Sequence, residues 1–402
     1  MNSWIKTGRE VVLIRLPNWL GDAVMASGII SALKEKWPEI QLLVVAPEAI
    51  LQVFADDPRI HGFASSSHKR STKSKIVMPD AFSPLAIRLK PIKTLCRKIR
   101  YFLCPPPLIF TTKNGVQFSA SIDLCVRLTH SFSSTWHLLL RARSPMIGTG
   151  MWAHHSKGVT RALGKKEGDG KTMHLVEQYS QLLQPLIPDI TPRGPKLFVD
   201  SVLREQYIDA IQKQHICINS HKSMQWIAIN SEAAYGPAKC WPKEYFIDLT
   251  LKIIQNPNMA CLFLGDAQGK DSVHQLVDAV AQGIDSCMTK KSAIEAKKRI
   301  VNLAGKTSLK ELMVLLQACD MLITGDSGPM HLRSALAQEK HGLIALFGST
   351  NPAKTGPLDS SHVLYQKQSC SPCYLRKCPI DFRCMRSLSV DRVYQELLRQ
   401  LA

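Results

Sequence analysis

The chain has 402 residues, more than one hydrophobic core normally organises, so two domains are expected. Its formal net charge is +19, with 51 Lys and Arg residues against 32 Asp and Glu residues, which favours an anionic partner such as nucleic acid, acidic lipid or a phosphorylated substrate. No apolar run reaches the roughly 18 residues of a membrane span, and the first residues lack the pattern of a secretory signal. We therefore expect a cytoplasmic protein, whose 12 cysteines are thiols or metal ligands rather than disulfides.

Strands and helices alternate through the first half. The continuous apolar run at 11–16 (VVLIRL) predicts a strand buried on both faces, and a loop (PNWLG) then leads into a predicted helix over 22–36. Further strands are predicted at 40–47, within 120–129 and at 146–150, and a further helix at 176–186. This alternation is typical of a parallel, doubly wound sheet.

The second half repeats the pattern. Strands are predicted at 226–230, 259–265, 299–305, 321–324 and 343–348, and a helix is predicted at 308–319. A proline-rich stretch, PLIPDITPRGP, lies where the halves join, near 185–205. The sequence therefore predicts an α/β protein with two Rossmann-like domains and a cleft between them, an arrangement that suits a two-substrate transfer enzyme. The expected bounds are 1–190 for the N-terminal domain, 200–385 for the C-terminal domain and 386–402 for a terminal helix.

A basic segment interrupts this alternation of strands and helices. Residues 58–122 contain twelve Lys or Arg residues and one acid, Asp80, and we expect an insertion at about 66–118. One interpretation is a solvated insertion; another is a basic amphipathic lip that docks on an anionic membrane or substrate. A nucleic-acid binder is disfavoured, because no recognised nucleic-acid fold is visible and aromatic residues are too few for base stacking.

The stretch MLITGDSGPMHLRSALA, at 321–337, joins a predicted strand to a predicted helix. Gly325 and Gly328 allow a sharp turn and a close approach to a ligand, and Ser327 or Gly328 is expected to cap the helix. A helix that begins at the C-terminal edge of a parallel strand offers free N–H groups to an anion. An ordinary capped turn is the alternative interpretation.

Six segments, in order, carry a family resemblance. They are LPNWLGDAVMASGIISALKEKWP, LTHSFSSTWHLL, VEQYSQLL, AAYGPAKCWPKEYF, NLAGKTSLKELMVLLQACDMLITGDSGPMHLRSALA and LIALFGSTNPAKTGP. Together they resemble the heptosyltransferases of the lipopolysaccharide core, glycosyltransferase family 9. The resemblance implies the GT-B architecture and metal-independent, inverting transfer of heptose. It places ADP-L-glycero-D-manno-heptose on the C-terminal half and a lipid-linked inner-core acceptor on the N-terminal half.

The resemblance also implies site residues. Asp22 matches the family's catalytic aspartate, the base for the acceptor hydroxyl, although its place at a helix start stabilises the carboxylate and so weakens it as a base. Simple helix capping is the alternative for Asp22. Asn18 and Arg15, near this aspartate, are expected to bind the acceptor.

The donor side carries the other expected residues. Lys239 is expected to bind the diphosphate, where it and the helix start can stabilise the leaving group's charge. Asp326 is expected to accept hydrogen bonds from sugar hydroxyls or to pin its loop, and Asp266 to lie near the ribose. The remaining expected donor-site residues are Ser327, Gly328 and His331. The alternatives are a solvated loop lysine for Lys239, a turn residue for Asp266 and a core-facing histidine for His331.

The sequence departs from the family pattern at some positions. The usual PGAAYGPAKRWP reads NSEAAYGPAKCWP, with Cys240 in place of an arginine, and Gly325 replaces an asparagine. The expected acceptor is the inner-core heptose; the alternatives are a family member that acts on Kdo and a nucleotide-sugar epimerase of GT-B fold.

The expected partners are ADP-heptose, the lipid-linked acceptor and the anionic inner face of the inner membrane, where the protein would bind peripherally; nucleic acid is not expected. No cofactor is expected. Four cysteines near the C-terminus allow a structural zinc, but reduced, loop-packing thiols are the favoured interpretation. These cysteines are Cys370, Cys373, Cys378 and Cys384.

Overall fold

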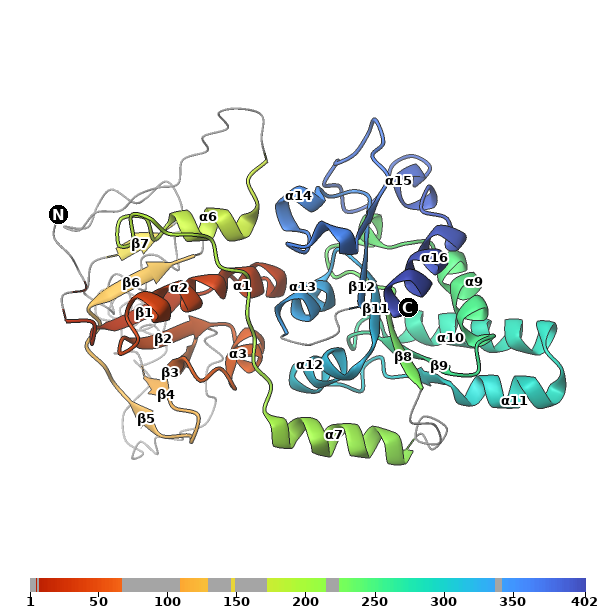
Figure 1. The fold of residues 1–402 in the computed structure, drawn as a ribbon, viewed down its shortest axis with the longest axis horizontal. Helices are drawn as coiled ribbons and strands as arrows, with labels where there is room; N and C mark the ends of the chain where they lie inside the picture. The colour runs from red at the N-terminus through yellow and green to blue at the C-terminus, as the bar shows by residue number, and fades with distance from the viewer. Residues whose placement is uncertain are drawn as a thin grey trace, which may run out of the picture.

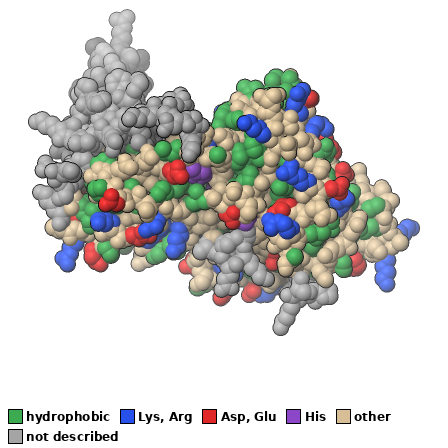
Figure 2. All heavy atoms as spheres, turned by 45° about the horizontal axis from the view of Figure 1, so that its top comes forward, with side chains coloured by type: hydrophobic (Ala, Val, Ile, Leu, Met, Phe, Trp, Pro, Cys, Tyr) green, Lys and Arg blue, Asp and Glu red, His purple; other side chains and the backbone are tan. Residues whose placement is uncertain are grey.

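A computed structural model describes most of the chain. The described residues are 5, 7–66, 109–128, 146–148, 172–214, 224–336 and 342–402. Most of the basic segment, with the basic lip predicted in it, lies outside these residues, as does most of the LTHSFSSTWHLL motif. The described residues are nearly balanced in charge, and acidic and basic side chains intermingle on the face shown in Figure 2.

The N-terminal half contains a sheet with the order β5-β4-β3-β2-β1-β6-β7 (Figure 1). The strands are β1 (Val11–Arg15), β2 (Gln41–Ala46), β3 (Ile60–Ser65), β4 (Phe110–Thr111), β5 (Gln117–Phe118), β6 (Leu124–Arg127) and β7 (Met146–Gly148). The neighbouring strands β3, β2, β1, β6 and β7 all pair parallel. The strand order changes direction between β1 and β6. The short strands β4 and β5 pair antiparallel at the β3 edge. The end of the predicted insertion at 66–118 therefore belongs to the sheet, a pairing that its basic composition did not reveal.

The predicted helix over 22–36 is two helices, α1 (Leu20–Ala26) and α2 (Gly28–Lys36), separated at Ser27. The break lies where the interdomain linker crosses: a Cβ atom on Gly28 would lie 2.1 Å from the carbonyl oxygen of Arg193. The other helices of this half are α3 (Glu48–Phe54) and α6 (Leu175–Gln181). A linker about 165 residues away in sequence thus shapes the first helical segment, which local sequence could not indicate.

The C-terminal half contains an entirely parallel sheet with the order β10-β9-β8-β11-β12-β13. The strands are β8 (Gln225–Asn230), β9 (Met259–Leu264), β10 (Ile300–Asn302), β11 (Met321–Gly325), β12 (Gly342–Phe347) and β13 (Val363–Tyr365). In chain order this is the 3-2-1-4-5-6 arrangement of a Rossmann fold. The order reverses between β8 and β11, and this crevice is where such sheets bind nucleotides.

Helices cover both faces of the C-terminal sheet (Figure 1). The helices of this half are α7 (Ser201–Gln214), α9 (Lys243–Ile254), α10 (Lys270–Cys287), α11 (Lys290–Lys298), α12 (Leu309–Ala318), α13 (Gly328–Ala335), α14 (Pro352–Thr355), α15 (Arg383–Arg386) and α16 (Val390–Leu401), with short 3-10 turns at Pro237–Lys239 and Ser360–His362. Of these, α7 packs on α12. Ser308 caps α12 through a capping box with Glu311, as its position before the apolar run predicts. The terminal helix α16 packs on α9 and β12, and its Gln400 side chain hydrogen-bonds the backbone of Leu343.

One apolar cluster runs through both halves, because α1 packs on α13 and α3 packs on α12. The closest approach joins α1 to α13. A Cβ atom on Gly21 would lie 2.4 Å from Cδ2 of His331, and one on Gly328 would lie 2.8 Å from Cδ2 of Leu20. Polar contacts also link the halves, including the ion pair between Lys310 and Asp56 at 2.9 Å. These contacts fix α1 beside the start of α13.

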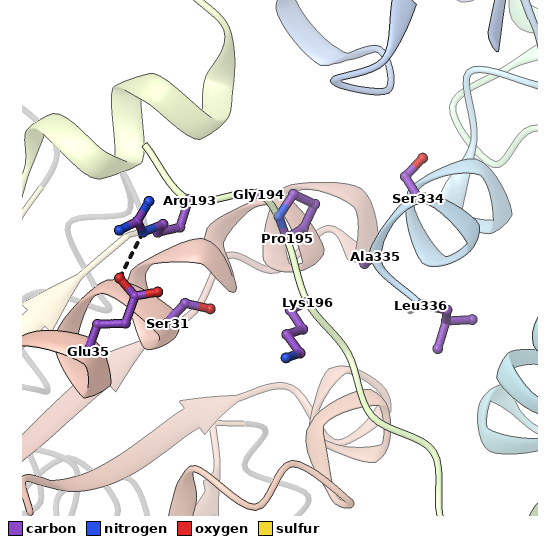
Figure 3. A pocket seen from close by; sticks show the side chains of 9 residues that line it. All are labelled: Ser31, Glu35, Arg193, Gly194, Pro195, Lys196, Ser334, Ala335 and Leu336. Carbon is purple, nitrogen blue, oxygen red and sulfur yellow. Dashed lines mark hydrogen bonds and ion pairs between the residues drawn. The ribbon is translucent and has the colours of Figure 1, made fainter. Parts of the chain in front are cut away.

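The linker between the halves is held to both of them (Figure 3). Its Lys196 backbone N–H donates to Ser27 Oγ at 2.9 Å, and Arg193 Nε lies 2.8 Å from a carboxylate oxygen of Glu35 on α2. One residue later, the Leu197 N–H donates to the carbonyl of Ala335 at the end of α13. A cavity of about 340 Å³ opens between α2, the linker and α13.

Candidate functional site

A cavity of about 780 Å³ lies between the two halves. The N-terminal half contributes α1 and the residue before it, and the C-terminal half contributes the loops that follow its central strands. The cavity is lined by seven of the nine residues predicted for the site: Asp22, Lys239, Asp266, Asp326, Ser327, Gly328 and His331. The structure therefore brings the expected base and the expected donor residues to one space.

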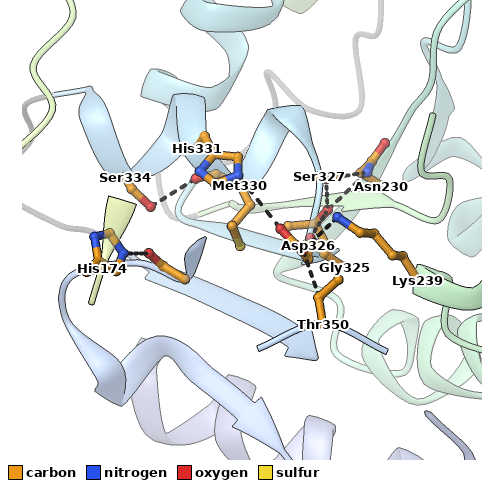
Figure 4. A network of polar contacts seen from close by, with 12 residues as sticks. His174, Asn230, Lys239, Gly325, Asp326, Ser327, Met330, His331, Ser334 and Thr350 are labelled. Atoms are coloured by element: carbon orange, nitrogen blue, oxygen red, sulfur yellow. Dashed lines mark hydrogen bonds and ion pairs between the residues drawn. The ribbon is translucent and has the colours of Figure 1, made fainter. Parts of the chain in front are cut away.

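Asp326 is the centre of a polar network at the switch point between β8 and β11 (Figure 4). Its Oδ2 accepts hydrogen bonds from Lys239 Nζ at 2.7 Å and from Thr350 Oγ1 at 2.8 Å. His331 Nε2 lies 3.7 Å from Oδ1, too far for a hydrogen bond but close enough for electrostatic attraction. Asp326 therefore pins its loop, one of the two roles predicted for it.

This network perturbs the pKa of Asp326. Burial alone would raise the pKa, but the neighbouring His331 imidazole and Lys239 ammonium outweigh it and lower the pKa from 3.8 to about 2. The carboxylate is therefore ionised near neutral pH, where it holds the Lys239 ammonium by a hydrogen bond.

The Asp326 pKa predicts a pH dependence of stability. A carboxyl group whose pKa is lowered by folding stabilises the native state above its unfolded pKa, and this contribution is lost as the pH falls through the folded pKa. The free energy of unfolding should therefore fall by about 2 kcal/mol between about pH 4 and pH 2 on account of this group. Denaturant titrations of the wild type and Asp326→Asn across this range measure it. Equal losses in the two proteins would contradict it.

Lys239 follows β8 in a short 3-10 turn, Pro237–Lys239, and its side chain is only 16% exposed. Gly236, with φ of +148°, begins this turn, and a Cβ atom there would lie 2.6 Å from the carbonyl oxygen of Arg376. The ammonium also lies 4.9 Å from the centroid of the Tyr235 ring. Lys239 is therefore a fixed cation at the cavity, not a solvated loop lysine.

Ser327 occupies the N-cap position of α13, but its side chain does not cap the helix, contrary to the sequence prediction. Its hydroxyl instead pairs with Thr324 Oγ1 at 2.8 Å and accepts from Asn230 Nδ2 at 3.2 Å. The hydroxyl thus ties β8 to β11. At the start of α13 the Gly328 N–H has no partner within the helix, and Pro329 carries no N–H.

Asp22 is the third residue of α1 and is half-buried beside the cavity. The helix begins after Trp19, which provides no side-chain cap, so Asp22 is not the N-cap residue. Burial, and secondarily the charge of Asp22, raise the pKa of Tyr179 on α6 above its usual range. A neutral phenol therefore lies within electrostatic range of the expected base.

The two residues predicted to bind the acceptor do not line the cavity. Arg15 is buried at the end of β1, and its guanidinium donates to the carbonyls of Leu16 and Val45 and to Asn18 Oδ1. Burial lowers the pKa of Arg15 to about 10. It pairs in register with Arg127 of β6, which is also buried. Arg15 is buried beside β6, at the switch point of the N-terminal sheet, and Asn18 is exposed three residues after it; their acceptor role stays a prediction.

A model of the protein family described as glycosyltransferase family 9 (heptosyltransferase) matches residues 118–382. The chain belongs to this family. It is therefore a glycosyltransferase.

Named relatives of this family 9 glycosyltransferase are heptosyltransferases. Lipooligosaccharide heptosyltransferase 2 of Haemophilus ducreyi is 26% identical over 399 residues, covering 97% of this chain and 99% of the relative. Lipopolysaccharide heptosyltransferase 2 of Salmonella typhimurium is 32% identical over 126 residues, 31% of this chain and 32% of the relative.

The fold is shared with solved structures. That of E. coli ADP-heptose LPS heptosyltransferase II has a TM-score of 0.62 at 20% identity and covers 97% of this chain and 98% of its own. The family 9 glycosyltransferase of Veillonella parvula has a TM-score of 0.66 at 17% identity, covering 98% and 97%. The predicted GT-B architecture, two Rossmann-like domains with a cleft, is confirmed.

Several residues that line the cavity of this glycosyltransferase were not predicted from the sequence: Asn230, Glu232, Thr307, Ser308, Thr355 and Arg376. Glu232 follows β8, and the rule that parallel strands present their carboxyl ends at one edge of the sheet could have found it. Arg376 lies in the cysteine-rich segment, where no local signal indicates a substrate contact. It reaches the cavity because its backbone carbonyl accepts from the Ala238 N–H at 3.0 Å.

The four C-terminal cysteines of this glycosyltransferase differ in exposure: Cys370 and Cys373 are exposed, Cys378 is half-buried and Cys384 is buried. Across the part of the chain that the structure describes, no three His, Cys, Asp or Glu side chains are arranged as metal ligands. The zinc interpretation therefore gains no geometric support.

Proposed function

We propose that this enzyme transfers heptose from ADP-L-glycero-D-manno-heptose to the inner-core heptose of lipopolysaccharide, with inversion and without a metal. The observation that carries the proposal is the cavity in which Asp22, from the N-terminal half, faces Lys239, Asp326 and His331, from the C-terminal half. The likeness to lipooligosaccharide heptosyltransferase 2 over nearly the whole of both chains supports the choice of reaction.

The C-terminal half binds the donor in this proposal. The diphosphate lies at the switch point, against the start of α13, where Gly328 has a free N–H, and beside Lys239. As the bond between the anomeric carbon and the phosphate oxygen breaks, ADP gains negative charge, and these fixed donors stabilise that charge where it develops. Asp326 acts indirectly, because its hydrogen bond orients the Lys239 ammonium. Asp266, after β9, lies at the ribose end of the cavity.

The N-terminal half activates the acceptor. An acceptor hydroxyl attacks the anomeric carbon from the side opposite to the leaving ADP, and its proton passes to the Asp22 carboxylate as the new bond forms. Arg15 and Asn18 belong to the acceptor side in this proposal, since their 2.8 Å hydrogen bond fixes the loop that leads to Asp22.

The choice of acceptor sugar separates this reaction from two alternatives. The alternatives are transfer to Kdo and, in a different class, epimerisation of the nucleotide sugar. Incubation of the enzyme and ADP-heptose with two defined acceptors, one ending in Kdo and one carrying the first inner-core heptose, separates the first two. Mass spectrometry should show one added heptose on the second acceptor alone. Addition to the Kdo acceptor alone would overturn the assignment.

We also propose peripheral binding to the cytoplasmic face of the inner membrane, where a lipid-linked acceptor would be presented. No helix in the described ranges is long and apolar enough to cross a membrane. The proposal rests on the sequence of the basic segment, in which apolar residues alternate with Lys and Arg: Arg88, Lys90, Lys93, Arg97, Lys98 and Arg100. Each basic residue near an anionic surface contributes about 1 kcal/mol at most, so several must act together.

The protein should sediment with anionic lipid vesicles at low salt and be released at about 0.5 M salt, where charges are screened over a few ångströms. Replacing the six basic residues by Ser should abolish co-sedimentation and leave ADP affinity unchanged, because the donor residues lie in the other half. Neutral vesicles are the control. Full co-sedimentation of the six-fold variant would show that this segment is not the membrane contact.

A further inference from the structure

Glu232 is a carboxylate that the mechanism above leaves unused. It follows β8 by two residues, lines the cavity between the halves and is half-buried. Asn230 Nδ2 donates to its backbone carbonyl at 2.9 Å, and Ser272 Oγ, from the first turn of α10, donates to its Oε1 at 2.6 Å. Both the backbone and the side chain of Glu232 are therefore held in place.

Asp266 is a second fixed carboxylate beside Glu232. Its Oδ1 accepts from the backbone N–H groups of Gln268 at 3.0 Å and of Gly269 at 2.7 Å. A Cβ atom on Gly269 would lie 3.2 Å from Glu232 Cγ and 3.4 Å from Asp266 Oδ1, so the two acids flank this glycine. Each carboxylate uses one oxygen to hold its position. Within the described residues, Glu232 Oε2 and Asp266 Oδ2 accept no hydrogen bond from the protein.

Two carboxylates in a cavity that binds a diphosphate weaken its binding, because like charges repel. Their presence calls for hydrogen-bond donors on the ligand, and an ADP-sugar carries vicinal hydroxyls on its ribose. In a Rossmann sheet the acid that follows the second strand hydrogen-bonds the ribose 2′-hydroxyl, and here that strand is β9 and the acid is Asp266. Glu232 follows the first strand, β8, on the same loop as Lys239.

We propose that Glu232 accepts a hydrogen bond from the ribose 3′-hydroxyl of the donor, beside Asp266 on the 2′-hydroxyl, and so makes the site selective for an intact ribonucleotide. The inference rests on the proposed ADP-sugar donor. The 3′ carbon is bonded to the ring carbon that carries the phosphate arm, so its hydroxyl lies on the side of the ribose nearer to Lys239. Glu232 shares the loop after β8 with Lys239, and its Oε2 is not used by the Ser272 contact.

The test compares the dissociation constants of ADP, 2′-deoxy-ADP and 3′-deoxy-ADP by calorimetry. The ratio of the 3′-deoxy-ADP constant to the ADP constant is the informative quantity, because both ligands carry the same charge and general electrostatic effects cancel. In the wild type this ratio should be on the order of ten, as expected for a hydrogen bond to a half-exposed charged group. The Glu232→Ala variant should lower the ratio to within about twofold of one, and leave the 2′-deoxy-ADP ratio as it was.

Two further variants make the result specific. Asp271→Ala removes an acid from the exposed first turn of α10, outside the cavity, and should leave both ratios unchanged. Glu232→Gln keeps the side-chain volume and one neutral acceptor, and its 3′ ratio should fall between those of the wild type and Glu232→Ala. Because Gln preserves the packing, an unchanged 3′ ratio in this variant and in Glu232→Ala overturns the inference.

The remaining outcomes distinguish this inference from the proposed function. Wild-type protein with no measurable ADP affinity contradicts the ADP-sugar donor, and the Glu232 assignment falls with it. Normal ADP binding with a 3′ ratio that is insensitive to Glu232 contradicts the Glu232 assignment alone. If Glu232→Ala lowers the ratio of the 2′-deoxy-ADP constant to the ADP constant and leaves the 3′-deoxy-ADP ratio unchanged, the assignment of Glu232 to the 3′-hydroxyl is also overturned.

Discussion

Asp22→Asn should lower kcat by roughly 10²–10⁴, the usual contribution of a positioned general base, and leave ADP affinity close to the wild-type value. The amide has nearly the shape of the carboxylate but cannot take the acceptor proton. Asp22 lies on α1 across the cavity from the Lys239 network, so the donor contacts should be preserved. Steady-state rates with saturating donor and acceptor, together with ADP titration, measure both quantities.

Glu48→Gln is the matched control for this variant. Glu48 also lies in the first turn of a helix of the N-terminal half, α3, but it is exposed and does not line the cavity. The Glu48→Gln variant should retain wild-type turnover. This result would separate a loss of the chemical step in Asp22→Asn from a general effect of removing a carboxylate at a helix start. Near-full activity of Asp22→Asn would remove Asp22 from the mechanism.

Lys239→Ala should weaken ADP binding by about 10–100-fold, since a charge-assisted hydrogen bond contributes about 1.5–3 kcal/mol. Acceptor binding should change little, because the lysine lies in the donor half. The same variant should lower the free energy of unfolding, since it leaves the buried Asp326 carboxylate without its ammonium partner. Calorimetry with ADP and denaturant titration measure the two effects.

The double variant Lys239→Ala with Asp326→Asn separates these effects. Neutralising Asp326 removes the unpaired buried charge, so the double variant should be more stable than Lys239→Ala alone. Its ADP affinity should stay low, because the cation that binds the diphosphate is still missing. Restored ADP affinity in the double variant would show that Lys239 acts only by neutralising Asp326.

The central strands of both halves could be predicted because parallel strands covered on both faces appear as continuous apolar runs. The strand β3, whose burial alternates, and the short strands β4, β5 and β13 were not predicted. The site could be predicted in part from the central strands. Asp266 and Asp326 follow such strands, Lys239 lies in the short loop after another, and the carboxyl ends of parallel strands meet at one edge. The family resemblance then distinguished Asp22 from an ordinary helix-start acid.

Other features depend on contacts between residues far apart in the chain. Lys239 and Asp326 are 87 residues apart, and only the fold reveals that they form an ion pair. The break between α1 and α2 follows from the linker that crosses at Gly28. Arg15, the last residue of a buried strand, donates to nearby backbone carbonyls, and these contacts could not be predicted from the local sequence.

The most direct test of heptose transfer is the release of ADP from ADP-heptose with and without a lipid A–Kdo–heptose acceptor. The proposed function predicts that ADP release depends on the acceptor and equals the amount of heptose added to it. Conversion of the donor sugar in the absence of acceptor, with no heptose transferred when acceptor is present, would contradict it.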